Sequence, residues 1–301
     1  MNILITDITQ LLTLKGQKTA RISKDLSELS IIKDAAVYIE GEKIKYAGKE
    51  SDVIKHISKN DKHINIKAKG VVMPAFIDSH THSVFAKPRL LDFEMRSKGK
   101  SYLEIKKAGG GINRSAKDIK EASKEILSKN LKYFAQKFIE CGTTTVEVKS
   151  GYGLDLINEI KMLEVIKETA PFLSLEMIHT FLGAHSVPEK FSSSNEYLKY
   201  LKNKVLPSIA QKKLAKYVDI FVDDGYFGID ESIDYLEYAK KFGFVPRVHC
   251  EQLAHSGGSH VASMVKAVSA DHLDFADTND IKRMVKSGVS AIFLPASNYF
   301  M

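Results

Sequence analysis

The 301-residue sequence has no long hydrophobic run and only two cysteines. None of its apolar stretches approaches the roughly 20 residues that a membrane-spanning helix needs, so we expect no membrane partner. The N-terminus is mildly apolar, but it lacks a basic start and is interrupted by Asp7 and Gln10, so we expect no signal peptide. Cys141 and Cys250 are too few for a disulfide framework, which favours a reducing compartment and a cytoplasmic protein.

Arginine is also scarce. Only six of the 44 basic residues are arginine, although the formal net charge is +7. Lysines spread along helices are typical of a solvated surface, and the sequence has neither an arginine cluster nor an aromatic RNA-binding motif. We therefore expect no nucleic-acid partner. The remaining composition, 44% hydrophobic and 27% charged, is that of a globular protein with a large core.

The pattern of apolar residues changes near residue 70. Within residues 1–70, the segment AAVYIEGEKIKYAG alternates on both sides of Glu-Gly-Glu, which predicts a hairpin, and we expect a small N-terminal domain of the β-sandwich type. Residues 71–301 instead alternate strand-like runs with amphipathic segments. The predicted strands are VVMPAFID, TTTVEV, LSLEMIHTF, YVDIFV, FVPRVHC, AVSADHL and VSAIFLP.

Repeating strand–helix units predict an α/β fold with a parallel sheet and outer helices. Seven units in about 230 residues fit a nearly complete (β/α)8 barrel of the TIM type, which has typically ~250 residues. A doubly wound open sheet is the alternative, but it needs a glycine-rich turn between a strand and its helix. AGGGIN at 108–113 does not join these directly, so we predict a flexible loop there. Apolar spacing from Ile119 to Phe138 predicts one helix, which Gly142 terminates.

Polar residues stand where the predicted strands end, and a barrel places its catalytic groups at those ends. VVMPAFID reads as a buried strand and runs into Asp78, His80 and His82. Because His80 and His82 are two residues apart, they point to one face and can share a zinc-like ion at about 2.0–2.1 Å each. His249, at a later strand end, is the expected third ligand. An isolated His-x-His is more often a surface turn, but three histidines at one rim favour a metal site.

A metal ion of this kind lowers the pKa of its water to about 7. His272 ends another predicted strand and could move the proton or donate a hydrogen bond to the attacked carbonyl oxygen, since histidine titrates in the working range. The alternative is a structural histidine bonded to Asp271.

The segment PAFIDSHTH resembles the first-strand metal motif of the amidohydrolase superfamily, which has the pattern Asp-x-His-x-His. Further segments, in order from about residue 70 to the end, resemble the imidazolonepropionase family of histidine degradation. These segments are DFEMRSKGKSYLEIKKAGGGI, GTTTVEVKSGYGLD, TFLGAHSVP, VHCEQ and SADHLD.

The resemblance implies a hydrolase that opens the cyclic amide of 4-imidazolone-5-propanoate, a small anionic substrate, to give N-formimidoyl-L-glutamate. It also implies one zinc or iron ion and suggests a homodimer. Arg89 would hold the propanoate, which suits a guanidinium because it binds carboxylate through two hydrogen bonds. The remaining implied roles are metal binding by His80, His82 and His249, substrate contact by Tyr152, His185 and Gln252, and catalysis by His272 and Gln252.

The sequence departs from the family pattern after its seventh predicted strand. The family's fourth ligand is an Asp on an eighth strand, and no candidate for that strand follows LPASNYFM. We therefore expect an incomplete barrel without that ligand, belonging either to a fragment or to a degenerate product.

Three alternatives stay open. The first is another mononuclear amidohydrolase. Binuclear members require a lysine that is carbamylated, and YVDIFVDDGYF has none. Deaminases of this group have Glu where this chain has Gln252. The second is a catalytically inactive, truncated metal-binding relative, and the third is a small-molecule binding protein.

Overall fold

The computed structural model describes residues 1–16, 21–58 and 60–300, and the chain separates into two compact units, Met1–Ala75 and Phe76–Met301. The division follows Ala75 instead of the expected residue 70. The reason is that residues 71 and 72 belong to the last strand of the small unit.

The small unit contains one four-stranded sheet in the order β3-β2-β1-β4. Strand β1 is antiparallel to β2 and parallel to β4, and β2 and β3 form the predicted hairpin, which is confirmed. Apolar side chains on both faces of the sheet build two small clusters, one around Tyr38 and one around Ile8. The elements are β1 (Asn2–Leu12), η1 (Ser23–Ser27), β2 (Ile31–Glu40), β3 (Lys43–Lys49), α1 (Glu50–Lys55) and β4 (His63–Val72).

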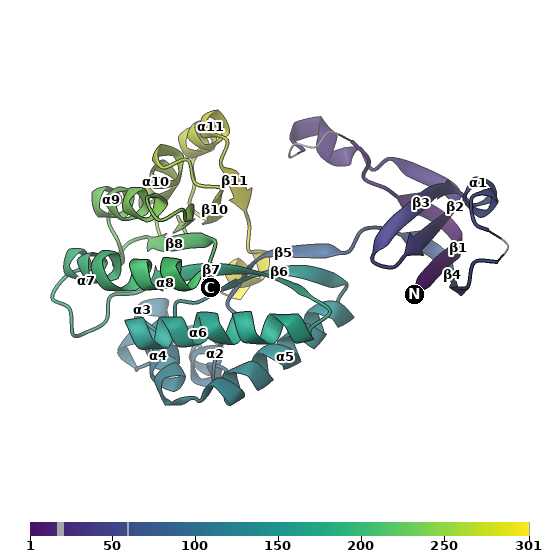
Figure 1. Ribbon diagram of the computed structural model, residues 1–301. Coiled ribbons are helices and arrows are strands. Elements are labelled where there is room, and N and C mark those ends of the chain that lie inside the picture. The colour runs from purple at the N-terminus through teal and green to yellow at the C-terminus, as the bar shows by residue number, and fades with distance from the viewer. Residues whose placement is uncertain (17–20, 59, 301) are drawn as a thin grey trace. The chain divides into compact units, whose positions relative to one another are not determined.

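The second unit is a nearly closed barrel of seven parallel strands, which confirms the predicted fold class (Figure 1). Neighbouring strands follow the chain order from β5 to β11, as successive strand–helix–strand crossovers require. Strands β5 and β11 are the edges of the sheet, and no eighth strand lies between them in the described ranges. The strands are β5 (Phe76–Thr81), β6 (Thr143–Lys149), β7 (Glu176–Ala184), β8 (Tyr217–Val222), β9 (Val245–Cys250), β10 (Ser269–His272) and β11 (Ser290–Ile292).

Helices cover the outside of the barrel, and their buried faces join the strands in one large apolar core (Figure 1). The helical elements before β8 are α2 (Leu90–Ser97), α3 (Tyr102–Lys107), α4 (Gly111–Glu121), α5 (Lys124–Glu140), α6 (Leu156–Thr169), η2 (Ala170–Phe172), α7 (Ser194–Tyr200), η3 (Leu201–Val205) and α8 (Leu206–Lys212). Those after β8 are α9 (Ile229–Lys240), α10 (Gly258–Met264), α11 (Thr278–Ser287) and α12 (Pro295–Phe300).

The first barrel strand differs from its prediction. The expected buried strand began at Val71, but β5 begins at Phe76, and Val71 belongs to β4. The side chains of Phe76 and Ile77 are 55% and 69% exposed, so the expected burial was wrong. The reason is topological, because β5 is an edge strand that pairs with β6 alone.

The predicted single helix from Ile119 to Phe138 was also wrong, since it is two helices, α4 and α5. Ser123 separates them by accepting a hydrogen bond from the backbone N–H of Ile126, which makes it the N-cap of α5. The buried face of α5 consists of Leu127, Leu131 and Ala135. The loop predicted at 108–113 is shorter than expected, because α4 already begins at Gly111.

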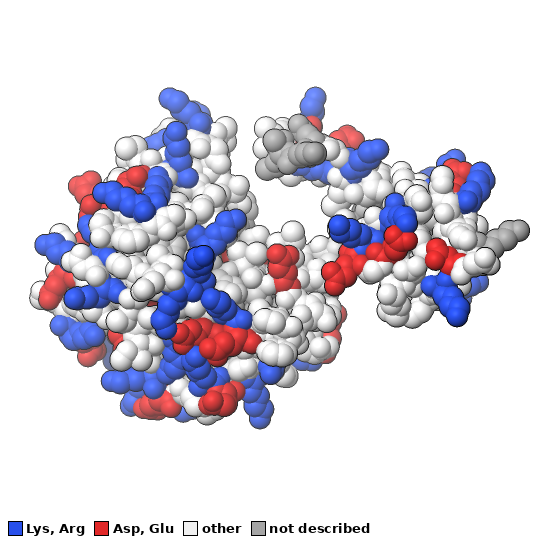
Figure 2. All heavy atoms as spheres, in the orientation of Figure 1, with Lys and Arg blue, Asp and Glu red and all other residues white. Residues whose placement is uncertain are grey.

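Charged side chains are mixed on the face drawn in Figure 2, where Lys and Arg lie among Asp and Glu instead of forming one basic patch. In the ranges that the structure describes, no helix has both the length and the apolar character needed to cross a membrane.

Candidate active site

A cavity opens at the carboxyl ends of the barrel strands. All eight side chains that the sequence singled out line it, although they come from six separate segments of the chain. They are His80, His82, Arg89, Tyr152, His185, His249, Gln252 and His272.

The imidazoles of His80, His82 and His249 converge at the base of this cavity. One ring nitrogen from each lies within 4.8 Å of the others, and Nε2 of His82 is 3.4 Å from Nε2 of His249. Two nitrogens that bind one ion tetrahedrally at about 2.0–2.1 Å lie about 3.4 Å apart, so this spacing fits a shared cation. Burial lowers the pKa of His80 and of His82 well below the usual value, with Lys149 adding to the effect at His80 and His185 at His82. The rings of His80 and His82 are therefore neutral and offer their lone pairs to an ion.

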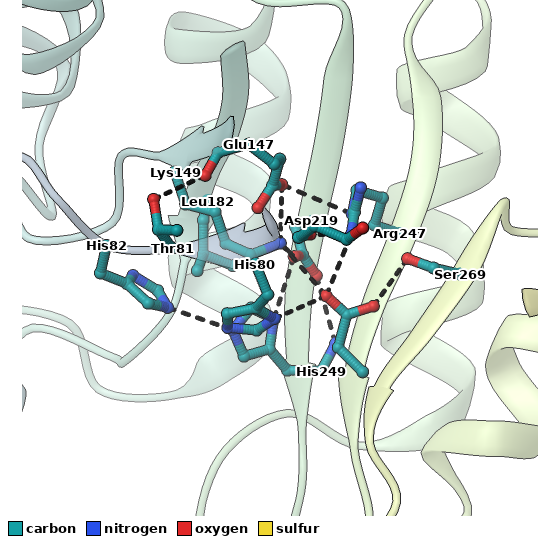
Figure 3. Close-up of polar contacts among 12 residues, drawn as sticks. His80, Thr81, His82, Glu147, Lys149, Leu182, Asp219, Arg247, His249 and Ser269 are labelled. Atoms are coloured by element: carbon teal, nitrogen blue, oxygen red, sulfur yellow. Dashed lines mark hydrogen bonds and ion pairs between the residues drawn. The ribbon is translucent and has the colours of Figure 1, made fainter. Parts of the chain in front are cut away.

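Two carboxylates behind these rings set their orientation. Nδ1–H of His80 donates to Oδ2 of Asp271 at 2.7 Å, and Nδ1 of His249 lies 2.9 Å from Oδ2 of Asp219 (Figure 3). A protonated Nδ1 leaves Nε2 as the free acceptor, and such carboxylate–histidine pairs are the usual support of a metal ligand. The hydrogen bond of Asp271 is thus to His80. The alternative in which His272 is a structural histidine bonded to Asp271 is not what the structure shows.

Lys149 connects the two carboxylates through its ammonium group. Its buried Nζ lies 2.7 Å from Asp219, 2.8 Å from Glu147 and 3.3 Å from Asp271 (Figure 3). Burial alone would lower the pKa of Lys149, but the three carboxylates outweigh it and raise that pKa. The ammonium therefore lies among the same carboxylates, Asp219 and Asp271, that could form a second metal group with His249. This arrangement favours one metal ion over two.

Sequence reasoning missed the roles of Asp219 and Arg247. Arg247 donates from Nη2 to Oδ2 of Asp271 at 3.2 Å and to the backbone carbonyl of Ser79 at 2.8 Å, which links β9 to β10 and β5. A signal was present, because both residues are charged positions inside otherwise apolar strand runs, YVDIFV and FVPRVHC. Charged side chains are almost never fully buried unless they are paired.

Arg89, Tyr152 and His185 line the cavity beside the three histidines. The guanidinium of Arg89 lies 5.9 Å from the ring centre of Tyr152. The ring of His185 stacks on that of His82 with centres 5.0 Å apart, and its Nδ1–H donates to the backbone carbonyl of Gly151 at 3.0 Å. Burial, followed by the nearby His249, lowers the pKa of His185 to about 3. The imidazole is therefore neutral near pH 7 and keeps Nε2 as an acceptor.

Gln252 and His272 complete the rim. The loop with Gln252 is fixed by Asp223, whose carboxylate accepts the backbone N–H groups of Gln252, Leu253 and Ala254 at 2.8, 2.9 and 3.1 Å. The ring of His272 is centred 5.1 Å from that of His80 and 5.2 Å from that of His249. Burial, followed by His249, lowers the pKa of His272 to about 3, so this imidazole is neutral near pH 7.

Comparison with known proteins identifies relatives of this chain by sequence. No protein-family model matches the chain. The imidazolonepropionase of Bdellovibrio bacteriovorus is 38% identical over 303 residues, which cover 100% of this chain and 71% of that protein. The imidazolonepropionase of Clostridium tetani is 36% identical over 301 residues, covering 99% of this chain and 71% of that protein.

Solved structures show the same fold at low identity. A guanine deaminase from C. acetobutylicum superposes with a TM-score of 0.66 at 12% identity, covering 100% of this chain and 69% of that one. A 5-methylcytosine deaminase from Klebsiella pneumoniae gives a TM-score of 0.63 at 14% identity, covering 96% of this chain and 65% of that one.

Proposed function

This chain belongs to the imidazolonepropionase family, and we propose that its cavity hydrolyses the cyclic amide of 4-imidazolone-5-propanoate to N-formimidoyl-L-glutamate in histidine degradation. The observation that carries the proposal is the convergence of three imidazoles in a cavity that an arginine also lines, in a chain 38% identical to the imidazolonepropionase of Bdellovibrio bacteriovorus. The substrate combines what these groups recognise, namely an amide to be hydrolysed and a carboxylate.

The three histidines fit one zinc or iron ion, because imidazole ligands suit both metals and the 3.4 Å nitrogen spacing suits a shared ion. His80, His82 and His249 would hold it. When bound, the ion supplies Lewis acidity that lowers the pKa of a coordinated water to about 7.

Substrate orientation falls to three other side chains that line the cavity, those of Arg89, Tyr152 and His185. The Arg89 guanidinium binds the propanoate through two charge-assisted hydrogen bonds, and the Tyr152 ring centre lies 5.9 Å from that guanidinium and 5.5 Å from the ring centre of His82. His185 accepts a hydrogen bond from the imidazolone ring through Nε2, since its Nδ1–H is already given to Gly151. The cyclic amide is thereby directed toward the three histidines.

Proton transfer falls to His272. Its ring is centred 5.1 Å from that of His80 and 5.2 Å from that of His249, so it is placed to take the proton that the attacking water loses and to return it to the ring nitrogen released when the amide C–N bond breaks. The Gln252 side chain cannot shuttle a proton, so its amide orients the substrate by hydrogen bonding. Glu251, the adjacent carboxylate, accepts from the backbone N–H groups of Gly257 and Ser259 at 3.0 and 2.9 Å instead, which argues against a deaminase-type glutamate.

The biological setting belongs to the same proposal. Cytosolic histidine degradation fits a protein with two cysteines, both of them free thiols, one buried and one exposed. A small anionic substrate fits an arginine-lined cavity, and the family resemblance supports a homodimer without nucleic-acid or membrane partners.

The function is tested by following imidazolone absorbance with purified protein, the 301-residue chain beside any longer version, supplied with zinc or iron. We expect metal-dependent loss of absorbance, and His249→Ala should lower metal affinity by more than about 100-fold and abolish turnover, because two imidazoles cannot hold the ion. His56→Ala, an exposed histidine of the small unit, is the control and should change neither. Metal-loaded protein that leaves the imidazolone intact would refute the assignment.

A further inference from the structure

One buried carboxylate holds the segment that carries Tyr152. Glu159, in the first turn of α6, is fully buried and accepts three backbone hydrogen bonds from that segment. Its Oε1 accepts the N–H groups of Gly153 and Leu154 at 2.7 and 2.9 Å, and its Oε2 accepts that of Gly151 at 3.1 Å. Tyr152 therefore lies between residues whose backbone is tied to one side chain.

The two glycines beside Tyr152 allow this close approach. A Cβ on Gly153 would lie 2.3 Å from the backbone nitrogen of Glu159, so only glycine lets the segment reach the start of α6. Gly151 has φ +112°, and a Cβ there would lie 2.8 Å from the carbonyl oxygen of Leu182 in β7. The segment is thus clamped between α6 and the end of β7.

The same segment also orients His185. The backbone carbonyl of Gly151 accepts Nδ1–H of His185, while the N–H of Gly151 is held by Glu159. A shift of Gly151 would therefore move the imidazole and the neighbouring Tyr152 ring together, whose centres are 5.4 Å apart. Both side chains line the cavity.

Burying a carboxylate is costly unless its oxygens accept hydrogen bonds. Burial raises the pKa of Glu159, and the hydroxyl of Ser150 and the backbone N–H groups act in the opposite direction by stabilising the charged form. The conformation of residues 150–154 therefore depends on the Glu159 carboxylate, and the charged form of that buried carboxylate depends on the N–H groups of the segment.

We propose that Glu159 is a positioning residue, which fixes Tyr152 and His185 for substrate binding through the backbone of residues 150–154. The inference rests on the proposed function for the role of those two side chains. The positioning itself can be measured without substrate or metal.

The test is Glu159→Gln, with Glu168→Gln as the matched control on the same helix, where Glu168 is exposed and paired with Lys124. A glutamine turns an NH2 group toward N–H donors, so we expect amide hydrogen exchange in residues 150–154 to become about tenfold faster. Exchange at residues 252–254, which Asp223 holds, should stay as in the wild type. KM should rise about tenfold, while kcat changes less than threefold, and the control should match the wild type.

Glu159→Asp is the second variant, because it keeps the charge if Glu159→Gln does not fold. It should show faster exchange at 150–154, since the shorter side chain cannot reach all three donors. Wild-type exchange there in whichever variant folds would overturn the inference. Wild-type protein that leaves the imidazolone intact would instead refute the proposed function, and the exchange rates would still decide whether Glu159 holds the segment.

Discussion

At the scale of single residues, Lys149 links the stability of the barrel to the geometry of the site. Its side chain is fully buried among three carboxylates, two of which orient the histidines His80 and His249. Removing one partner from a buried ionic cluster leaves the others uncompensated, which is typically far more destabilising than loss of a surface pair. The stability of the fold and the geometry of the site therefore share this one ammonium group.

We predict that Lys149→Met lowers the free energy of unfolding by about 3–5 kcal/mol, because it leaves buried carboxylates without their cation. Urea unfolding of the metal-free protein measures this change. Lys137→Met removes an exposed ion pair with Glu140 and is the control, for which no measurable change is expected. A stability of Lys149→Met equal to that of the control would contradict this account.

The positions of the site residues could be predicted from sequence because chemical groups at the ends of parallel strands meet at one rim. Their supports could not be predicted in the same way. His80 and Asp271 are 191 residues apart, and nothing local in the sequence indicates that their side chains touch. The sequence shows Asp219 only as a charged residue within the apolar run YVDIFV, and nothing in that run indicates that it pairs with His249 and Lys149.

At the scale of elements, strand existence was easier to predict than strand and helix ends. All seven predicted barrel strands exist, although β5 begins at Phe76 and not at Val71. The single helix expected from Ile119 to Phe138 failed because apolar spacing continues across Ser123, where the backbone leaves the helical conformation at ψ 162°. A serine that caps a helix and a serine on its surface look alike in a periodic pattern.

Ser123→Ala should therefore destabilise the protein by about 1 kcal/mol, since the N-terminal N–H groups of α5 lose their capping oxygen. The measurement is the midpoint and free energy of urea unfolding. Ser123→Asp is the matched control, because aspartate also caps and its charge suits a helix N-terminus. If the alanine and aspartate variants are equally stable, the cap contributes nothing.

At the scale of the whole molecule, buried neutral histidines make stability depend on pH. Burial lowers the folded-state pKa of His185 and of His272 to about 3, whereas an unfolded chain titrates near 6.5. Below that pH the unfolded state binds more protons than the folded state. The stabilisation is therefore complete above about pH 6.5 and declines as the pH falls toward the folded pKa, by up to about 1.4 kcal/mol per pH unit for each histidine.

We predict that the free energy of unfolding of the metal-free protein decreases steeply between pH 6.5 and about pH 4. His185→Gln should reduce that slope by up to about 1.4 kcal/mol per pH unit, because it removes one group that titrates only after unfolding. Denaturant unfolding at several pH values gives the slope directly. An unchanged slope in His185→Gln would show that this histidine is already protonated in the folded state.

The carboxylates of Glu159 and Asp223 hold their loops by accepting hydrogen bonds from main-chain N–H groups. Every amino acid except proline has such a group. The side chains at positions 152 and 252 take no part in these hydrogen bonds, so the loop conformation does not depend on which side chains they are. Tyr152 and Gln252 can be replaced without changing these main-chain hydrogen bonds. Replacing these two side chains is therefore a route by which proteins with this barrel acquire specificity for other small cyclic substrates.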